Sequence, residues 1–153
     1  MTAPEPGDPA PDFRLRDQNG EKIGLDDLRG KRSLIVFIPY PFTRVCTGEL
    51  CALRDERARL NELDANVVVV TCDTVAVNRK WAADNGFEFP VLSDFWPHGE
   101  MAQSYGAFND AYGYANRYTF VLDDTGIVRD VISTDELRTA REPDAYMEAL
   151  ANV

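Results

Sequence analysis

The residues of this chain best suited to redox or nucleophilic chemistry are its cysteines, Cys46, Cys51 and Cys72. The odd count is too small for a disulfide framework in a chain of 153 residues, and thiols in a reducing compartment are more often buried or catalytic. His98 is the only histidine, and cysteines five and twenty-one positions apart do not have the spacing of a zinc or copper site. We therefore expect a reactive thiol and no metal or other cofactor.

Cys46 stands where an apolar strand gives way to a helix. The run Ser33–Ile38 is apolar and stops at Pro39, and leucines recur at helical spacing through Cys46–Leu63. The first turn of a helix presents unpaired N–H groups and about half a positive charge, so a thiol placed there ionises more readily than a free cysteine. The helix raises the fraction of such a thiol that is ionised at pH 7 by only some thirtyfold. An efficient enzyme therefore also needs hydrogen-bond donors aimed at the substrate bond that breaks.

A peroxide O–O bond suits such a site. The thiolate attacks one oxygen while N–H groups and a cation hold the other oxygen as it leaves with the charge. Thr43 offers a hydroxyl, and Pro39 can exclude water without needing a hydrogen-bond partner. Without that chemistry, Thr43 would be a turn-forming residue and Pro39 a strand terminator.

The composition excludes several other functions. The chain carries 26 acidic against 16 basic residues, a net charge of −10, which repels nucleic acid and anionic lipid surfaces. Its longest apolar runs are far shorter than the ~20 residues of a membrane span. The Pro-rich, acidic start Met1–Pro11 lacks the basic and apolar stretches of a secretory signal. We expect a cytoplasmic protein with neither a nucleic-acid nor a membrane partner.

The order of predicted elements is that of a thioredoxin-like fold, a mixed α/β sheet flanked by helices. An N-terminal hairpin turning at Asn19-Gly20 precedes a strand–helix–strand–helix half, a second hairpin turning at Asp123–Gly126, and a final helix. At this length we expect a single domain over residues 1–153. After the first hairpin, the expected strands are Ser33–Ile38, Asn66–Thr71, Phe89–Leu92, Tyr118–Leu122 and Ile127–Ile132, and the expected helices are Cys46–Leu63, Asp73–Gly86 and Pro143–Ala151.

The segment that ends at Cys46 resembles the active-site signature of the peroxiredoxins. That signature is Pro-x-x-x-Thr-x-x-Cys after a hydrophobic strand, and it is matched at Pro39, Thr43 and Cys46. The likeness extends through nearly the whole chain and is most similar to the one-cysteine alkyl hydroperoxide reductase E group of actinobacteria. The segments that carry this wider likeness are Pro9–Phe13, Phe89–Asp94, Asp94–Gly99 and Ala115–Arg117.

The resemblance implies a role for each matched residue. Cys46 would be the peroxidatic cysteine, which peroxide oxidises to a sulfenic acid. Thr43 and Arg117 would hold the peroxide and activate the thiolate, and Pro39 would shield it. Glu49 would orient Arg117. From the residues alone, Arg117 is a solvated surface cation, and Glu49 is an acid pairing with the helix dipole that would oppose ionisation of Cys46.

Cys51 departs from the one-cysteine group and resembles the resolving cysteine of the PrxQ, or bacterioferritin-comigratory, branch. Five residues of helix separate the two Cα atoms by roughly 8–9 Å, beyond the ~7 Å that a disulfide tolerates, so joining Cys46 to Cys51 requires the helix to unwind. We expect Cys51 to attack the Cys46 sulfenic acid, and a thioredoxin-type partner to reduce the disulfide. Alternatively, Cys51 is a buried helix residue and external thiols, such as mycothiol with mycoredoxin, complete the cycle.

Half of the aromatic side chains fall between Phe95 and Phe120, more than one core face needs. Exposed tyrosine and tryptophan favour interfaces, and relatives often dimerise near the active site. We therefore expect a homodimer that shields the peroxide pocket, with core packing as the alternative for each ring. Cys72 ends an apolar strand and is expected to be buried filler.

Together these features predict a thiol-dependent peroxidase that reduces hydrogen peroxide and organic hydroperoxides through a Cys46 sulfenic acid, with peroxynitrite as a further candidate substrate. Two other classes would use the same features: a peroxide-sensing redox switch with little turnover, and a catalytically silent thioredoxin-fold binding module. The joint presence of Pro39, Thr43, Cys46 and Arg117 argues against the silent module.

Overall fold

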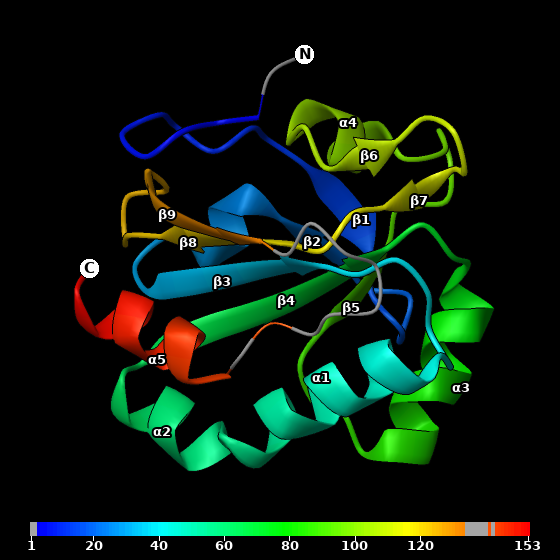
Figure 1. Cartoon of the computed structure of the whole chain (residues 1–153), viewed down its shortest axis with the longest axis horizontal. Coiled ribbons are helices and arrows are strands. Elements are labelled where there is room, and N and C mark those ends of the chain that lie inside the picture. Colours follow the sequence, from blue (N-terminus) through cyan, green and yellow to red (C-terminus); the bar gives the residue numbers. More distant parts are fainter. Residues whose placement is uncertain (1–2, 134–140, 142) are drawn as a thin grey trace.

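A central β-sheet with helices on both faces organises the chain (Figure 1). The computed structural model describes residues 3–133, 141 and 143–153. The strands are β1 (Arg14–Arg16), β2 (Lys22–Gly24), β3 (Arg32–Phe37), β4 (Ala65–Thr71), β5 (Val91–Ser93), β6 (Phe108–Asn109), β7 (Tyr114–Ala115), β8 (Tyr118–Leu122) and β9 (Val128–Ser133). The helices are the 3₁₀ turn η1 (Leu25–Leu28), α1 (Arg44–Asp55), α2 (Arg57–Glu62), α3 (Val75–Asn85), α4 (Glu100–Ser104) and α5 (Pro143–Ala151).

Seven of the strands form one mixed sheet in the order β2-β1-β5-β4-β3-β8-β9. The central strands β3, β4 and β5 are parallel, whereas β8 is antiparallel to β3 and β9 is antiparallel to β8. The β1–β2 hairpin joins the sheet through one antiparallel pairing, Arg16 with Ser93. The predicted mixed sheet with an added N-terminal hairpin is confirmed.

Both faces of the sheet are covered, as the continuous apolar runs predicted. Successive side chains of a strand point to opposite faces. Leu34 and Val36 pack in the layer that contains α1, α2, α3 and α5. Ile35 and Phe37 pack on the other face, with the N-terminal segment, η1 and α4.

The predicted helix Cys46–Leu63 was wrong in one respect, because the chain forms two helices there. Glu56 separates α1 from α2 with φ −89° and ψ 14°. Leu53 before the break and Leu60 after it are both buried in the same cluster. Because the leucine period continues across the break, the sequence pattern does not reveal it.

Four short elements were missed. They are the 3₁₀ turn η1, the helix α4 and the two-residue strands β6 and β7, all too short for a hydrophobic period to be visible. The N-terminus of α4 is held by the buried carboxylate of Asp94, which accepts hydrogen bonds from the N–H groups of Met101 and Ala102 at 3.0 and 2.8 Å. None of the helices among the described residues is long and apolar enough to cross a bilayer.

The pairing of β3 with β8 brings distant parts of the sequence to one end of the sheet. The two strands are antiparallel, with Val36 opposite Thr119. The carboxyl end of β3, which leads into Pro39 and α1, therefore faces the start of β8, which Arg117 immediately precedes. This register places Cys46 and Arg117 on adjoining segments.

Candidate active site

Cys46 is the third residue of α1 and is almost entirely buried, with 1% of its surface exposed. Thr43 precedes the helix in an extended conformation, with φ −84° and ψ 153°. The thiol borders a pocket of about 570 Å³. The pocket is lined by Pro39, Tyr40, Thr43, Arg44, Val45, Cys46 and Arg117. Three of the four residues of the expected active-site set therefore surround the fourth, Cys46.

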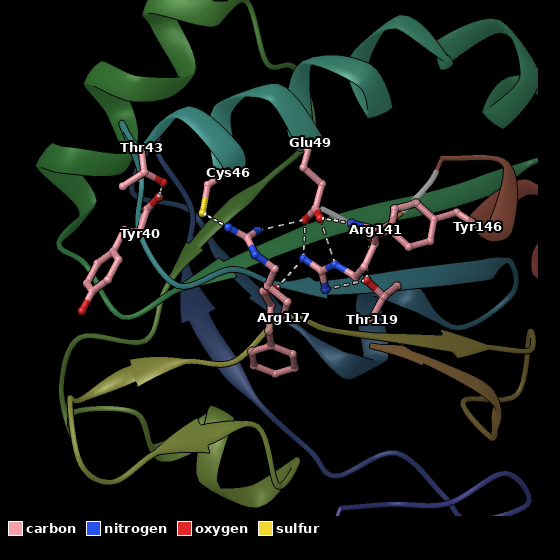
Figure 2. A network of polar contacts seen from close by, with 9 residues as sticks. Tyr40, Thr43, Cys46, Glu49, Arg117, Thr119, Arg141 and Tyr146 are labelled. Atoms are coloured by element: carbon pink, nitrogen blue, oxygen red, sulfur yellow. Dashed lines mark hydrogen bonds and ion pairs between the residues drawn. The ribbon is translucent and has the colours of Figure 1, made fainter. Parts of the chain in front are cut away.

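Arg117 reaches Cys46 from the position just before β8. Its Nη2 donates a hydrogen bond to Cys46 Sγ at 3.0 Å (Figure 2). The residue is only 3% exposed, so the alternative of a solvated surface cation is wrong. A guanidinium in this position favours a negative charge on the sulfur, since hydrogen bonds to charged groups are stronger than those to neutral ones.

Glu49 lies one turn further along α1 and joins two arginines. Its Oε1 is 3.6 Å from Arg117 Nη1, as expected for a residue that orients Arg117. Its stronger partner is Arg141, whose backbone N–H donates to Oε2 at 2.6 Å and whose Nε donates to Oε2 at 3.2 Å. The Arg141 Nη2 also forms a short ion pair with Oε1. All three side chains are buried, at 0–2% exposure.

Arg141 is further fixed by groups from the sheet and from α5 (Figure 2). Its Nη1 donates to Thr119 Oγ1 at 2.9 Å, and its Nη2 donates to the carbonyl of Phe37 at 2.8 Å. Thr119 Oγ1 in turn donates to the hydroxyl of Tyr146 at 3.2 Å. Burial raises the pKa of Tyr146, so this hydroxyl remains protonated. The Arg141 guanidinium is therefore held rigidly against Glu49.

In the contacts described above, two buried guanidinium groups share one carboxylate beside the sulfur of Cys46. Arg117 and Arg141 contribute two positive charges, and Glu49 contributes one negative charge. Unpaired charge in a buried site is costly, and the guanidinium beside the sulfur favours an anion there. Arg141 is the stronger partner of Glu49, and Arg117 contacts both Glu49 and the sulfur.

Thr43 and Pro39 lie on the pocket wall, with different degrees of exposure. Pro39 is buried, whereas Thr43 is exposed. The Thr43 hydroxyl donates to the carbonyl of Tyr40 at 2.9 Å. To donate to a bound peroxide, this hydroxyl would have to turn away from that carbonyl.

The other two cysteines lie in different environments from Cys46. Cys51 is half-buried on α1, and its thiol faces Asn85 at the end of α3, with Sγ 3.7 Å from Oδ1. Cys72 is buried at the end of β4, and burial raises its pKa to about 12. Cys72 is therefore a neutral thiol at physiological pH, as expected for buried filler.

His98 joins two surface loops. Its ring nitrogens lie 2.7 Å from the carbonyl oxygen of Gly113 and 3.1 Å from that of Phe95. Among the described residues, no three His, Cys, Asp or Glu side chains gather in a way that would hold a metal ion.

Arg141 is the site residue that the sequence analysis missed. It lies 92 positions from Glu49 and belongs to no strand or helix. An isolated arginine before a helix gives no spacing pattern that would link it to Cys46. The clue available in the sequence was Glu49 itself, because an acid beside a thiolate requires a compensating cation.

A buried thiol at the start of a helix, held by an arginine at the end of a mixed sheet, is the arrangement of a thiol-dependent peroxidase. The model of the AhpC/TSA family matches residues 6–131, and the chain belongs to this family. The chain is 47% identical over 124 residues to alkyl hydroperoxide reductase E of Mycobacterium tuberculosis, covering 80% of this chain and 81% of that protein.

Two further comparisons extend along more of the chain. Peroxiredoxin Bcp of Escherichia coli is 29% identical over 150 residues, which is 94% of each chain. The crystal structure of peroxidoxin BcpB from Mycobacterium tuberculosis superposes with a TM-score of 0.85 at 33% identity, covering 97% of this chain and 95% of that one. The thioredoxin-like fold and the thiol peroxidase activity expected from the sequence are confirmed.

The buried ion pair between Glu49 and Arg141 predicts a large loss of stability when either partner is removed. Arg141→Met leaves the buried carboxylate of Glu49 without its strongest partner, and Glu49→Gln leaves the buried Arg141 guanidinium without its counter-charge. We expect each substitution to lower the free energy of unfolding by about 3–5 kcal/mol. Chemical denaturation measures the change. Arg59→Met, which changes an exposed arginine, is the control and should cost less than about 1 kcal/mol. Equal effects for Arg59 and Arg141 would contradict the importance of the buried pair.

Proposed function

We propose that this protein reduces hydrogen peroxide and organic hydroperoxides through a sulfenic acid at Cys46. The observation that carries the proposal is the 3.0 Å contact between Arg117 Nη2 and Cys46 Sγ, two residues that line the same pocket. Support for organic hydroperoxides comes from the pocket volume of about 570 Å³ and from the apolar walls that Tyr40 and Val45 provide. The name of the mycobacterial relative, an alkyl hydroperoxide reductase, points to the same substrate class.

In the proposed reaction, the Cys46 thiolate attacks one peroxide oxygen and the O–O bond breaks. The other oxygen leaves as an alkoxide or hydroxide and takes up a proton, and the sulfur becomes a sulfenic acid. Arg117 stabilises first the thiolate and then the leaving oxygen. In this scheme Thr43 orients the peroxide, Pro39 excludes water, and Glu49 with Arg141 positions Arg117. Peroxynitrite would react by the same displacement.

The second step of the proposed cycle is attack of Cys51 on the Cys46 sulfenic acid, which gives a disulfide for a thioredoxin- or mycoredoxin-type reductant. Cys51 is half-buried rather than sealed in the core, which suits a thiol that must take part in exchange. Both cysteines lie in the continuous helix α1, so this step requires local unwinding. If Cys51 does not react, an external thiol would reduce the sulfenic acid, or the protein would act as a peroxide-sensing switch.

We also propose that the chain functions in the cytoplasm as a homodimer of single-domain subunits, with neither nucleic acid nor membrane as partner. Free thiols suit a reducing compartment, and the net charge of −10 disfavours anionic surfaces. The aromatic surface, defined as Tyr40, Phe42, Phe95, Trp96 and Tyr112, supports dimerisation because its side chains are exposed. Two other aromatic residues of the segment Phe95–Phe120, Tyr105 and Phe120, are buried in the core instead.

Cys46→Ser should abolish rapid peroxide consumption by the reduced protein. Arg117→Met should lower the second-order rate constant by about 10²–10³-fold, since a buried donor to the reacting atoms is lost. Stopped-flow measurement of peroxide loss checks both. Arg44→Met is the matched control, because Arg44 is an exposed arginine of the same pocket, and we expect only a few-fold change. Equal losses for Arg44 and Arg117 would contradict the assigned role.

One equivalent of hydrogen peroxide should convert the wild-type protein to a species with a Cys46–Cys51 bridge. Peptide mass spectrometry after rapid alkylation identifies the bridge, and the Cys51→Ser variant should accumulate the Cys46 sulfenic acid instead. A stable sulfenic acid with free Cys51 in the wild type would favour reduction by an external thiol.

The aromatic surface predicts a dimer at micromolar concentration. The double substitution Trp96→Ser, Tyr112→Ser removes two of its most exposed rings, at 81% and 76% exposure, and should shift the protein toward the monomer. Sedimentation velocity measures the change, with Arg57→Ser on α2 as the control. A wild-type protein that sediments only as a monomer would refute the dimer.

A further inference from the structure

The two halves of α1 are held in the fold very differently. After Gly48, the side chains of Glu49, Leu50 and Leu53 are 4%, 0% and 0% exposed. Glu49 is also locked into the buried ion pair with Arg141. Unwinding this half would leave a buried cation without its partner and expose apolar surface, both of which are costly.

The half of α1 before Gly48 has few anchors. Arg44 is exposed, Val45 and Thr47 are half-buried, and only Cys46 is fully buried. The contact of Cys46 with Arg117 is strongest for the thiolate and weakens once the sulfur becomes a neutral sulfenic acid. The structure also shows a hydrogen bond from Trp81 Nε1 to Thr47 Oγ1 at 3.1 Å. Oxidation of Cys46 therefore loosens the half that is already the more weakly held.

Gly48 stands at the boundary between these halves and has no packing reason to be glycine. It is exposed and helical, and a Cβ added there would meet no atom within 4 Å. A glycine in a helix interior nevertheless favours the unwound state about fivefold relative to alanine. The residue thus weakens α1 between the two cysteines at no gain in packing.

Building on the proposed role of Cys51, we propose that Gly48 is the hinge of the resolving step. The segment before it unwinds and carries Cys46 out of the Arg117 pocket toward Cys51, while Glu49 and the rest of α1 stay in place. The Cys51 thiolate then attacks the sulfur of the Cys46 sulfenic acid. The S–S bond forms, the S–O bond breaks, and the leaving hydroxide combines with a proton as water. Gly48 is a positioning residue in this step and does not touch the peroxide.

The test is Gly48→Ala, which strengthens the helix without a clash. We expect conversion of the Cys46 sulfenic acid to the 46–51 disulfide to slow about fivefold, the ~1 kcal/mol difference in helix propensity converted at 1.4 kcal/mol per tenfold. The rate of peroxide consumption should be unchanged. Rapid quench with a sulfenic-acid reagent and mass spectrometry separates the two steps. The matched control is Asn61→Ala, which raises helix propensity at an exposed position of α2. This variant should form the 46–51 disulfide at the wild-type rate.

A second variant should change the rate of disulfide formation in the opposite direction. Thr47→Val removes the acceptor for Trp81 Nε1 and keeps the β-branched shape, so it should accelerate resolution several-fold. A disulfide that forms at the wild-type rate in both variants, or that slows equally in Asn61→Ala, overturns the hinge and leaves the role of Cys51 intact. Absence of the bridge from oxidised wild-type protein overturns both.

Discussion

The site depends on one buried cluster of charges, in which Glu49 on α1 joins Arg117 and Arg141 behind the sulfur of Cys46. Each member would be costly to bury alone. Glu49 satisfies Arg141, and Arg117 contacts both Glu49 and the sulfur. The cluster therefore links the ionisation of Cys46 to groups far from it in the sequence. It also fixes α1 against the sheet, because Arg141 binds the Phe37 carbonyl and Thr119 as well.

This rigidity creates a conflict with the second half of the proposed cycle. Fast attack on peroxide requires a fixed thiolate, whereas joining Cys46 to Cys51 requires part of α1 to unwind. The uneven anchoring of α1 resolves the conflict. The ion cluster holds the helix from Glu49 onward, and the turn that carries Cys46 is held chiefly by a contact that is strongest before oxidation. Chemistry at the sulfur can then decide when the turn is released, without disturbing the core beneath Leu50 and Leu53.

The fold was predictable from the sequence wherever the apolar residues showed a clear periodicity or a turn or capping residue marked the end of an element. The expected bounds of Tyr118–Leu122 and Pro143–Ala151 agree with β8 and α5, and Gly86 caps α3 in the left-handed region, with φ 67°. Prediction failed where nothing periodic marks an element, as at the Glu56 break and in the two-residue strands β6 and β7. For the site, the motif through Cys46 and the position of Arg117 were predictable from the family resemblance.

Arg141 was not predictable, and the reason is physical. Its importance comes from burial and from a partner on another element, and neither leaves a mark in local spacing. Glu49 shows why the two must be considered together. Judged by itself, an acid one turn from Cys46 opposes formation of the thiolate, which was the alternative to an orienting role. Arg141 neutralises this carboxylate, so in the proposed mechanism Glu49 can hold Arg117 at the sulfur at little electrostatic cost to the thiolate. The proposed role of Glu49 therefore depends on the folded cluster and not only on its position in α1.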